Sequence, residues 1–405
     1  AAAGKASTES WLSRLQRLEL PRTLRAIVER RLRGLEPQLA EVVAIGALLG
    51  REFGAELLSE LCGLSEPTLA DALNDAIRRQ ILETAGGGRY RFTHDKLREA
   101  AYESISAVRK RELHSAAAVA MERRGVGATE LTELANHFSK AEIPGKAIVY
   151  LRRASEQALG AGAHQQAVPL LARAFEHADS PGSSTTKDER AKLHRLYADA
   201  LFGIGDSDGS VFHAEAALTA LGMALPQTTL RWVLMLLVQC AEQLLRITKE
   251  PVVDVSAADS DEERRIELAL AAGRLSSSYF SAHQSQLLVM TATFLAANLA
   301  DRAGPRGARS LPYSILGCTA GFFRMDRLSA LYFKRAREDV QRRGDRAVEA
   351  VIAIPECSLC QGMARWDSLV SLSEAAEAIA EQVDDRLAFE ALHLIRGGSE
   401  LLTGE

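Results

Sequence analysis

Residues 147–179 read AIVYLRRASEQALGAGAHQQAVPLLARAFEHAD, which is two helical stretches separated by Gly162. Within each stretch, small and apolar residues recur three or four positions apart, so they fall on one face of a helix. Helices approach closely where such side chains are short, and a glycine permits the tight turn between them. The segment therefore predicts two packed helices that meet through Leu151, Ala154 and Ala158 in the first and Ala167, Leu171 and Ala174 in the second.

The same kind of helix pair recurs further along the chain. A helix–turn–helix unit with small residues at its contact fits the tetratricopeptide pattern, and the units here are spaced by about 40 residues. A second unit turns at Gly205, and later units cover 316–336 and 347–380. Stacked units of this kind form an α-solenoid. We therefore expect tetratricopeptide-like helix pairs over 126–225 and again over 261–405, where the chain ends inside a further unit.

A hydrophobic helix and a linker are expected between these two blocks, over 226–260. The most apolar run, Trp232–Val238 (WVLMLLV), is shorter than the roughly 20 apolar residues that a membrane-spanning helix needs, so we expect no membrane crossing. Two interpretations remain open. The helix packs between the solenoid blocks, or it docks on a partner protein or a membrane surface through an amphipathic face.

A different module is expected upstream, over 36–125. Three helices precede a small β-hairpin, which is the composition of a winged-helix domain, and further helices follow over 95–106 and 108–124. The predicted fold is therefore all-α, a winged-helix module with a small β-hairpin followed by an α-solenoid. The three helices are predicted over 38–49, 55–61 and 66–79, and the two strands over 81–84 and 90–92.

The second strand runs directly into a helix through RYRFTHDKLREAAY, residues 89–102. Asp95 at the start of that helix suits the helix dipole. A histidine at position 94, with basic side chains nearby, suits a phosphate group bound at the same helix N-terminus. The alternative is that His94 and Asp95 only cap the helix and orient the hairpin. These two are the candidate binding residues of the chain, and the nearby basic residues are Arg91, Lys96 and Arg98.

Three further motifs lack part of what their chemistry requires. Gly4-Lys5-Ala6 has no hydroxyl residue and no glycine-rich loop to hold phosphates. The run GDSDG at 205–209 has no strand before its serine, as a hydrolase nucleophile would need. Cys357 and Cys360 have no second pair of ligands for zinc, so we expect them to be core cysteines. The sequence therefore predicts no catalytic and no metal-binding residue.

The charge balance is nearly neutral, with 49 basic and 53 acidic side chains and a formal charge of −4. It argues against a globally basic nucleic-acid binder. DNA binding through the predicted winged helix is not expected either, because acidic residues occupy its candidate recognition helix, at Glu66, Asp71 and Asp75. Five cysteines do not indicate a disulfide framework and no signal peptide is visible, so the expected compartment is the cytoplasm.

Three segments resemble the region that follows the nucleotide-binding core of STAND-type signalling ATPases. They are LPRTLRAIVERRLRGLEPQLAEVVAIGALLGREF at 20–53, YRFTHDKLREAAYESI at 90–105 and RKRELHSAAAVAMER at 109–123. That class includes transcriptional activators and large bacterial proteins in which the ATPase is joined to an adenylate or guanylate cyclase. The resemblance implies that residues 1–35 end the ATPase lid and that the ATPase core is missing upstream. The chain starts without a methionine and stops inside a helical pattern, so we expect a fragment, and its alanine- and arginine-rich composition suggests a bacterial source.

The resemblance also implies a role for His94 and Asp95. The pair is similar to the His-Asp of the MHD motif in NOD-like immune receptors, where the histidine contacts the β-phosphate of bound ADP. His94 would then sense the nucleotide and not catalyse a reaction. ATP or ADP is implied for the parent protein, and no cofactor for this segment alone.

The expected function is thus a regulatory segment of a larger signalling protein. In this interpretation the winged helix holds the nucleotide state, and the solenoid binds a protein or peptide effector. The alternative is a stand-alone tetratricopeptide adaptor that binds protein partners without any link to a nucleotide.

Overall fold

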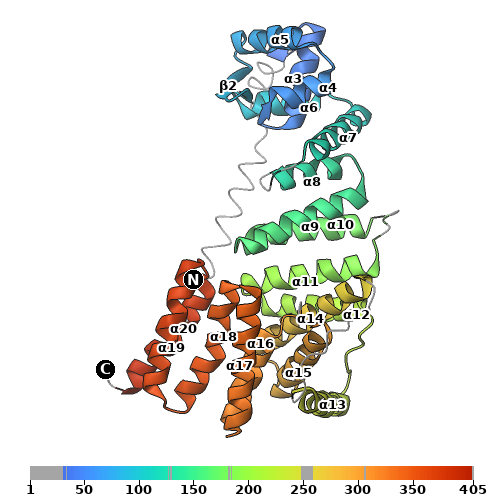
Figure 1. The fold of residues 1–405 in the computed structure, drawn as a ribbon. Coiled ribbons are helices and arrows are strands. Elements are labelled where there is room, and N and C mark those ends of the chain that lie inside the picture. The colour runs from blue at the N-terminus through green and yellow to red at the C-terminus, as the bar shows by residue number, and fades with distance from the viewer. Residues whose placement is uncertain are drawn as a thin grey trace, which may run out of the picture. The chain divides into compact units, whose positions relative to one another are not determined.

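The computed structural model describes residues 31–403 except 33, 126, 128–129, 181–182, 184, 248–258 and 305–306. Apart from one small sheet, the described residues form helices joined by short turns (Figure 1). The chain divides into an N-terminal unit, Ala1–Tyr150, and a C-terminal unit, Leu151–Glu405. Gly4-Lys5-Ala6, most of the predicted lid segment 1–35 and most of the linker before 261 lie outside the described residues. The predicted domain boundaries stay predictions.

The N-terminal unit begins with three helices and a three-stranded antiparallel sheet. The sheet order is β1-β3-β2, with Phe53 opposite Tyr90 and Leu82 opposite Phe92. The buried rings of Phe53 and Phe92 lie between the sheet and the helices. The elements are α3 (Pro37–Leu49), β1 (Glu52–Gly54), α4 (Ala55–Cys62), α5 (Glu66–Arg78), β2 (Leu82–Gly86) and β3 (Arg89–Phe92).

Two details of the predicted hairpin are wrong. A third strand, β1, pairs with β3, although its three residues are too few to show an alternating pattern in the sequence. In addition, β2 begins at Leu82 and continues to Gly86, so the turn comprises only residues 87 and 88. Gly87 and Gly88 have φ values of +57° and +71°, which glycine adopts without strain.

Four helices complete the N-terminal unit or continue beyond it. Ser106 caps α7 by accepting a hydrogen bond from the Arg109 backbone N–H. Phe138 and Tyr150 stack with their ring centroids 5.4 Å apart, which joins α8 to the first half of α9. The helices are α6 (Asp95–Glu103), α7 (Ala107–Arg124), α8 (Leu131–Lys140) and α9 (Pro144–Gly160).

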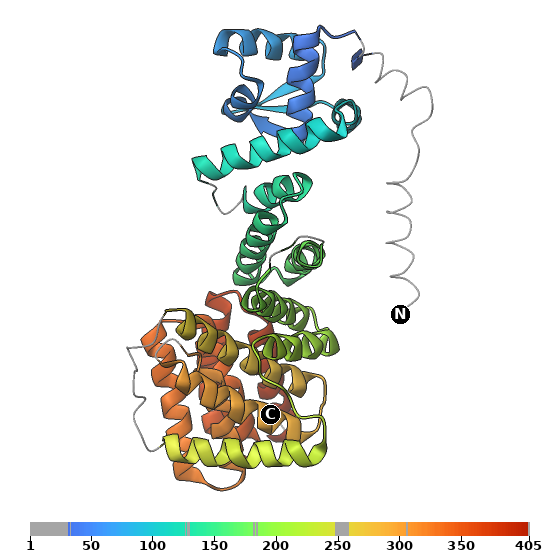
Figure 2. The same cartoon turned by 90° about the vertical axis from the view of Figure 1, so that its right-hand side faces the viewer.

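The C-terminal unit is a series of helices in which each packs on its neighbours in sequence, as in tetratricopeptide-like repeats (Figures 1 and 2). Alanine dominates the contacts, with Ala167, Ala174, Ala214 and Ala217 fully buried, as the sequence predicted. The helices are α10 (His164–Ala178), α11 (Lys187–Gly203), α12 (Ser207–Ala220), α13 (Thr229–Ile247), α14 (Asp259–Ser281), α15 (Gln286–Arg302), α16 (Ser310–Phe322), α17 (Asp326–Arg343), α18 (Arg346–Gly362), α19 (Trp366–Gln382) and α20 (Arg386–Thr403).

The turns between helices follow a regular spacing. The predicted turn glycines, Gly162 and Gly205, have φ values of +70° and +83°. Further along, residues 324, 344, 364 and 384 are also left-handed, and they lie twenty positions apart. Because each turn ends one helix, two such steps make a helix pair of about 40 residues, the spacing expected from the sequence.

Helix α13 packs on its neighbouring helices through one face, and docking of its other face on a partner or a membrane surface stays a prediction. Trp232 and Met235 pack on the core formed with α14 and α15, and Gln243 is fully buried. The opposite face is apolar and exposed, including Leu234, Leu237 and Val238, on the yellow-green helix of Figure 2. Among the described residues, no helix is both long enough and apolar enough to cross a membrane.

Replacing Gly46 with alanine is expected to destabilise the N-terminal unit by about 1–3 kcal/mol. A Cβ at this position would lie 2.7 Å from Cζ of the buried Phe53 ring, which has no room to withdraw. Gly145 in α9 is the matched control, because a Cβ there meets nothing within 4 Å. Urea denaturation followed by circular dichroism checks this packing, and a Gly46→Ala midpoint equal to that of Gly145→Ala would contradict it.

Candidate functional site

His94 lies between the end of β3 and the start of α6, and Asp95 is the first residue of α6, both at the surface of the N-terminal unit. His94 occupies the N-cap position with an extended backbone, φ −141° and ψ 134°, yet its side chain makes no capping hydrogen bond. Its carbonyl oxygen accepts hydrogen bonds from the Leu97 and Arg98 N–H groups. The imidazole is therefore exposed and not used by the helix it precedes.

Asp95 forms an ion pair that the sequence did not reveal. Its Oδ1 lies 3.3 Å from Nε of Arg51, which directly precedes β1. Both side chains are more than half exposed, at 67% for Arg51 and 51% for Asp95. An exposed pair contributes little to stability, so either group can exchange its partner at small cost.

The basic residues expected around His94 are partly engaged elsewhere. Arg91 donates to Glu83 at 2.5 Å across the hairpin, and Lys96 donates to Glu99 at 2.7 Å along α6. Arg98 faces a pocket further along α6. The structure therefore brings Arg51, and not the predicted cluster, to Asp95.

The hairpin is fixed by a residue next to the pair. Thr93 Oγ1 donates a hydrogen bond to the Gln80 carbonyl oxygen at 2.8 Å, which ties the end of β3 to the end of α5. Since Thr93 orients the hairpin and His94 makes no side-chain cap, the capping interpretation does not account for His94.

The other motifs have structural roles within the described residues. Asp206 caps α12 by accepting a hydrogen bond from the Gly209 N–H at 2.9 Å, so the GDSDG run is a helix start. Cys357 and Cys360 are buried, as predicted, and burial raises the pKa of the Cys357 thiol to about 12. No three His, Cys, Asp or Glu side chains in the described part of the chain are grouped to hold a metal.

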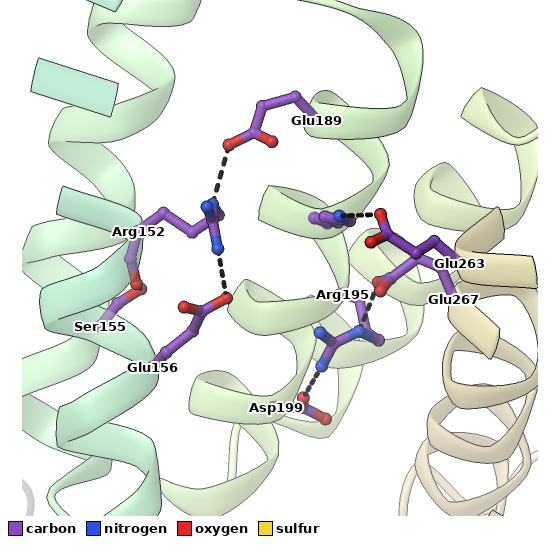
Figure 3. A network of polar contacts seen from close by, with 9 residues as sticks. Arg152, Ser155, Glu156, Glu189, Arg195, Asp199, Glu263 and Glu267 are labelled. Carbon is purple, nitrogen blue, oxygen red and sulfur yellow. Dashed lines mark hydrogen bonds and ion pairs between the residues drawn. The ribbon is translucent and has the colours of Figure 1, made fainter. Parts of the chain in front are cut away.

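A ladder of ion pairs connects α9, α11 and α14 in the C-terminal unit (Figure 3). Arg152 donates to Glu156 at 2.6 Å and to Glu189 at 2.8 Å. Arg195 donates to Asp199 at 2.9 Å and also pairs with Glu267. These charges are mutually neutralised, so the ladder fastens successive repeats and presents no unpaired charge to a partner.

The pKa of Arg195 shows how strongly this arginine interacts with its two carboxylate partners. Burial would lower the pKa of its guanidinium, but Glu267 and Asp199 outweigh burial and raise that pKa. Arg274 donates to the other oxygen of Asp199 at 2.5 Å, so this carboxylate holds two arginines from different helices.

Comparisons with known proteins give a structural likeness. No protein-family model matches the chain, and no curated protein matches it. Among solved structures, the chain is similar to a Signal Transduction ATPase with Numerous Domains (STAND) protein with a tetratricopeptide repeat sensor from Pyrococcus horikoshii. The identity is 12% and the TM-score 0.39, over 92% of this chain and 55% of that one. The chain thus spans about half the length of that protein.

Proposed function

We propose that this chain is the regulatory segment of a STAND-type signalling ATPase, with its N-terminal unit acting as a winged helix that reports the nucleotide state. The observation that carries the proposal is the exposed imidazole of His94, which stands at a helix N-terminus without capping it. A helix N-terminus favours an anionic ligand, and a histidine placed there adds a hydrogen-bond donor.

The residues at this site could donate hydrogen bonds to one phosphate group of a nucleotide. His94 supplies one donor, and Arg51 supplies a second when it leaves Asp95. Two exposed donors do not hold a nucleotide by themselves, so most of the affinity for ADP would come from the ATPase core. His94 and Arg51 would contribute only the difference in affinity between two arrangements of the core and this unit, which is what a two-state switch requires.

The solenoid is proposed to bind a protein or peptide effector. Stacked helix pairs offer a long continuous surface that suits protein partners. The arginines and carboxylates of the ion-pair ladder are already paired with one another. An effector would therefore be recognised by other, exposed side chains of the solenoid. Effector binding would then bias the switch that His94 reports, and the output, such as a nucleotide cyclase, would lie in another part of the protein.

The test measures ADP release from the full-length gene product. Loss of one hydrogen bond to a charged phosphate costs about 1.5–3 kcal/mol, so His94→Ala is expected to speed ADP dissociation tenfold or more. His393→Ala is the control, because His393 lies in α20 and its side chain is 61% exposed. Stopped-flow fluorescence of a labelled ADP gives the rate.

If His94→Ala retains ADP as the unaltered protein does, with unchanged basal output, the sensing role is wrong. Nucleotide-independent binding of peptides by a full-length protein that lacks an ATPase core would establish the adaptor alternative. DNA binding is not part of the proposal. Arg78 and Arg79, the basic residues at the end of α5, both pair with Asp75 and so are already neutralised.

A further inference from the structure

A pocket of about 330 Å³ lies in the N-terminal unit, and neither His94 nor Asp95 lines it. Its walls come from the end of α3, the start of β1, and the facing sides of α6, α7 and α8. Its volume is at the small end of the range for ligand pockets. Its polar lining includes Arg51, Arg98, Tyr102, Glu133, Asn136 and Lys140.

Two charged side chains in this pocket have no partner. Within the part of the chain that the structure describes, Arg98 of α6 and Glu133 of α8 form no side-chain hydrogen bond or ion pair, with each other or with any neighbour. Both are half-buried. Two further charged groups of the lining form ion pairs: Arg51 lies 3.3 Å from Asp95, and Glu52 lies 2.6 Å from Arg89.

Positive charge gathers around Tyr102, with Arg98 and Lys140 in the lining of the pocket and Lys110 outside that lining. Lys110 and Lys140 lie 4.4 Å and 5.0 Å from the centroid of its ring, and Arg98 is one turn away on the same helix. These cations act at short range: burial, the neighbouring His137, Lys140 and Lys110 together lower the pKa of His114 to about 3. A carboxylate bound here would offset their mutual repulsion.

The negative side of the pocket is Glu133. Burial and the nearby Glu130 raise the pKa of its carboxyl group, and Arg89 opposes this only in part. Burial disfavours the charged form of an acid that has no counterion. An ammonium group beside Glu133 would supply that counterion.

The polar side chains of α8 arrange these charges along one helix face. Glu133, Asn136 and Lys140 are three, four and seven positions apart, so they project from the same side of α8. Acidic and basic side chains of the pocket therefore lie along one face of α8.

We propose that this pocket binds a free amino acid as its zwitterion, with the carboxylate at Arg98 and the ammonium group at Glu133. A guanidinium takes a carboxylate through two parallel hydrogen bonds. A simple anion would leave Glu133 without a partner, and a simple amine would leave Arg98 without one. The proposal does not use His94 or Asp95, although Arg51, the second phosphate donor proposed above, also lines this pocket.

The test begins with thermal unfolding of the chain in the presence of each of the protein L-amino acids and of γ-aminobutyrate. A ligand at about 100 times its Kd stabilises the folded state enough to raise the midpoint clearly. Each amino acid that does so is titrated by calorimetry beside its des-amino acid and its decarboxylated amine. We expect both analogues to bind at least tenfold more weakly than the amino acid.

Two substitutions assign the ends of the ligand. Arg98→Gln is expected to weaken amino-acid binding at least tenfold, because it removes the charged partner of the carboxylate. Glu133→Gln is expected to abolish the preference for the amino acid over its des-amino analogue. Arg109→Gln is the control, since Arg109 is half exposed, pairs with Glu41 and does not line the pocket.

Three results would overturn the proposal. One is that no amino acid in the panel stabilises the chain. Another is that inorganic phosphate or the des-amino acid binds as tightly as the amino acid, which would make this a general anion site. The third is binding that is unchanged by both Arg98→Gln and Glu133→Gln.

Discussion

Lowering the pH from 7.5 to 5.0 is expected to remove about 4 kcal/mol of stability from the N-terminal unit, through one pair of buried histidines. His114 of α7 and His137 of α8 are 1% and 4% exposed. Their Nδ1 atoms lie 2.8 Å apart, and His114 Nε2 lies 3.0 Å from the Tyr102 hydroxyl. One ring must donate and the other accept at the Nδ1 contact, so the two rings cannot both be protonated there.

The direction of the effect follows from the pKa values of the two rings. Burial, followed by His137, Lys140 and Lys110, lowers the pKa of His114 to about 3, and burial and Lys140 lower that of His137 to about 4. In the unfolded chain a histidine titrates near 6.5. The stabilisation is therefore complete above pH 6.5 and is lost as the pH falls from 6.5 towards 4 for His137 and towards 3 for His114. At pH 5 each ring accounts for about 2 kcal/mol.

The measurement compares urea denaturation at several pH values with a double variant, His114→Asn/His137→Asn. The two amides can still form a hydrogen bond across the contact, but they do not titrate. Near pH 5 the unfolding free energy should fall with decreasing pH in both chains, and the slope should be about 2.7 kcal/mol per pH unit smaller in the double variant than in the original chain. His393→Asn is the control, since its side chain is 61% exposed. A pH slope shared by all three chains would contradict the assignment.

A second pair repeats this geometry in the C-terminal unit. His194 of α11 and His213 of α12 place their Nδ1 atoms 2.9 Å apart beside Phe175 and Tyr197. Burial, His213 and Arg190 lower the pKa of His194 to about 4, with Asp179 opposing them, and burial lowers that of His213 against Asp206. The C-terminal unit should therefore lose stability over the same pH range.

These histidine pairs show what the sequence could not reveal. The repeat spacing and the alanine positions predicted which helices pair, because helical periodicity is a local signal. It does not say that a histidine on one helix faces a histidine on the next, since 23 residues separate the first pair and 19 the second. The contact depends on the rotation of each helix about its axis, which the packing of the whole unit sets.

Some residues of the candidate site could be identified from the sequence and others could not. His94 and Asp95 could be chosen from the sequence because they follow a strand and begin a helix. Arg51 could not, because it lies 44 positions before Asp95 and is brought there by β1, a strand of three residues. The pocket was missed for a related reason, since α3, α6, α7 and α8 each contribute only a few lining residues.

The C-terminal unit also contains a buried charge cluster that joins three helices. Asp339 of α17 is 2% exposed by side chain and lies 3.4 Å from Nε of Arg309, which is 5% exposed. Arg309 precedes α16 and also lies 3.8 Å from Asp301 at the end of α15. Asp301 in turn accepts a hydrogen bond from the Tyr313 hydroxyl at 2.5 Å. The guanidinium of Arg309 is thus held in the interior by two carboxylates.

Replacing Asp339 with alanine is expected to cost about 3–5 kcal/mol, because it leaves Arg309 buried with one distant counterion. Arg342→Ala is the matched control: it removes an exposed partner of the same carboxylate and should cost about 1 kcal/mol or less. The double variant Arg309→Met/Asp339→Leu should recover part of the loss, since it removes the closer ion pair and leaves Asp301 with the hydrogen bond from Tyr313. Urea denaturation followed by the fluorescence of Trp232 and Trp366, both in this unit, measures all three. If Asp339→Ala costs no more than Arg342→Ala, the cluster does not hold α15, α16 and α17 together.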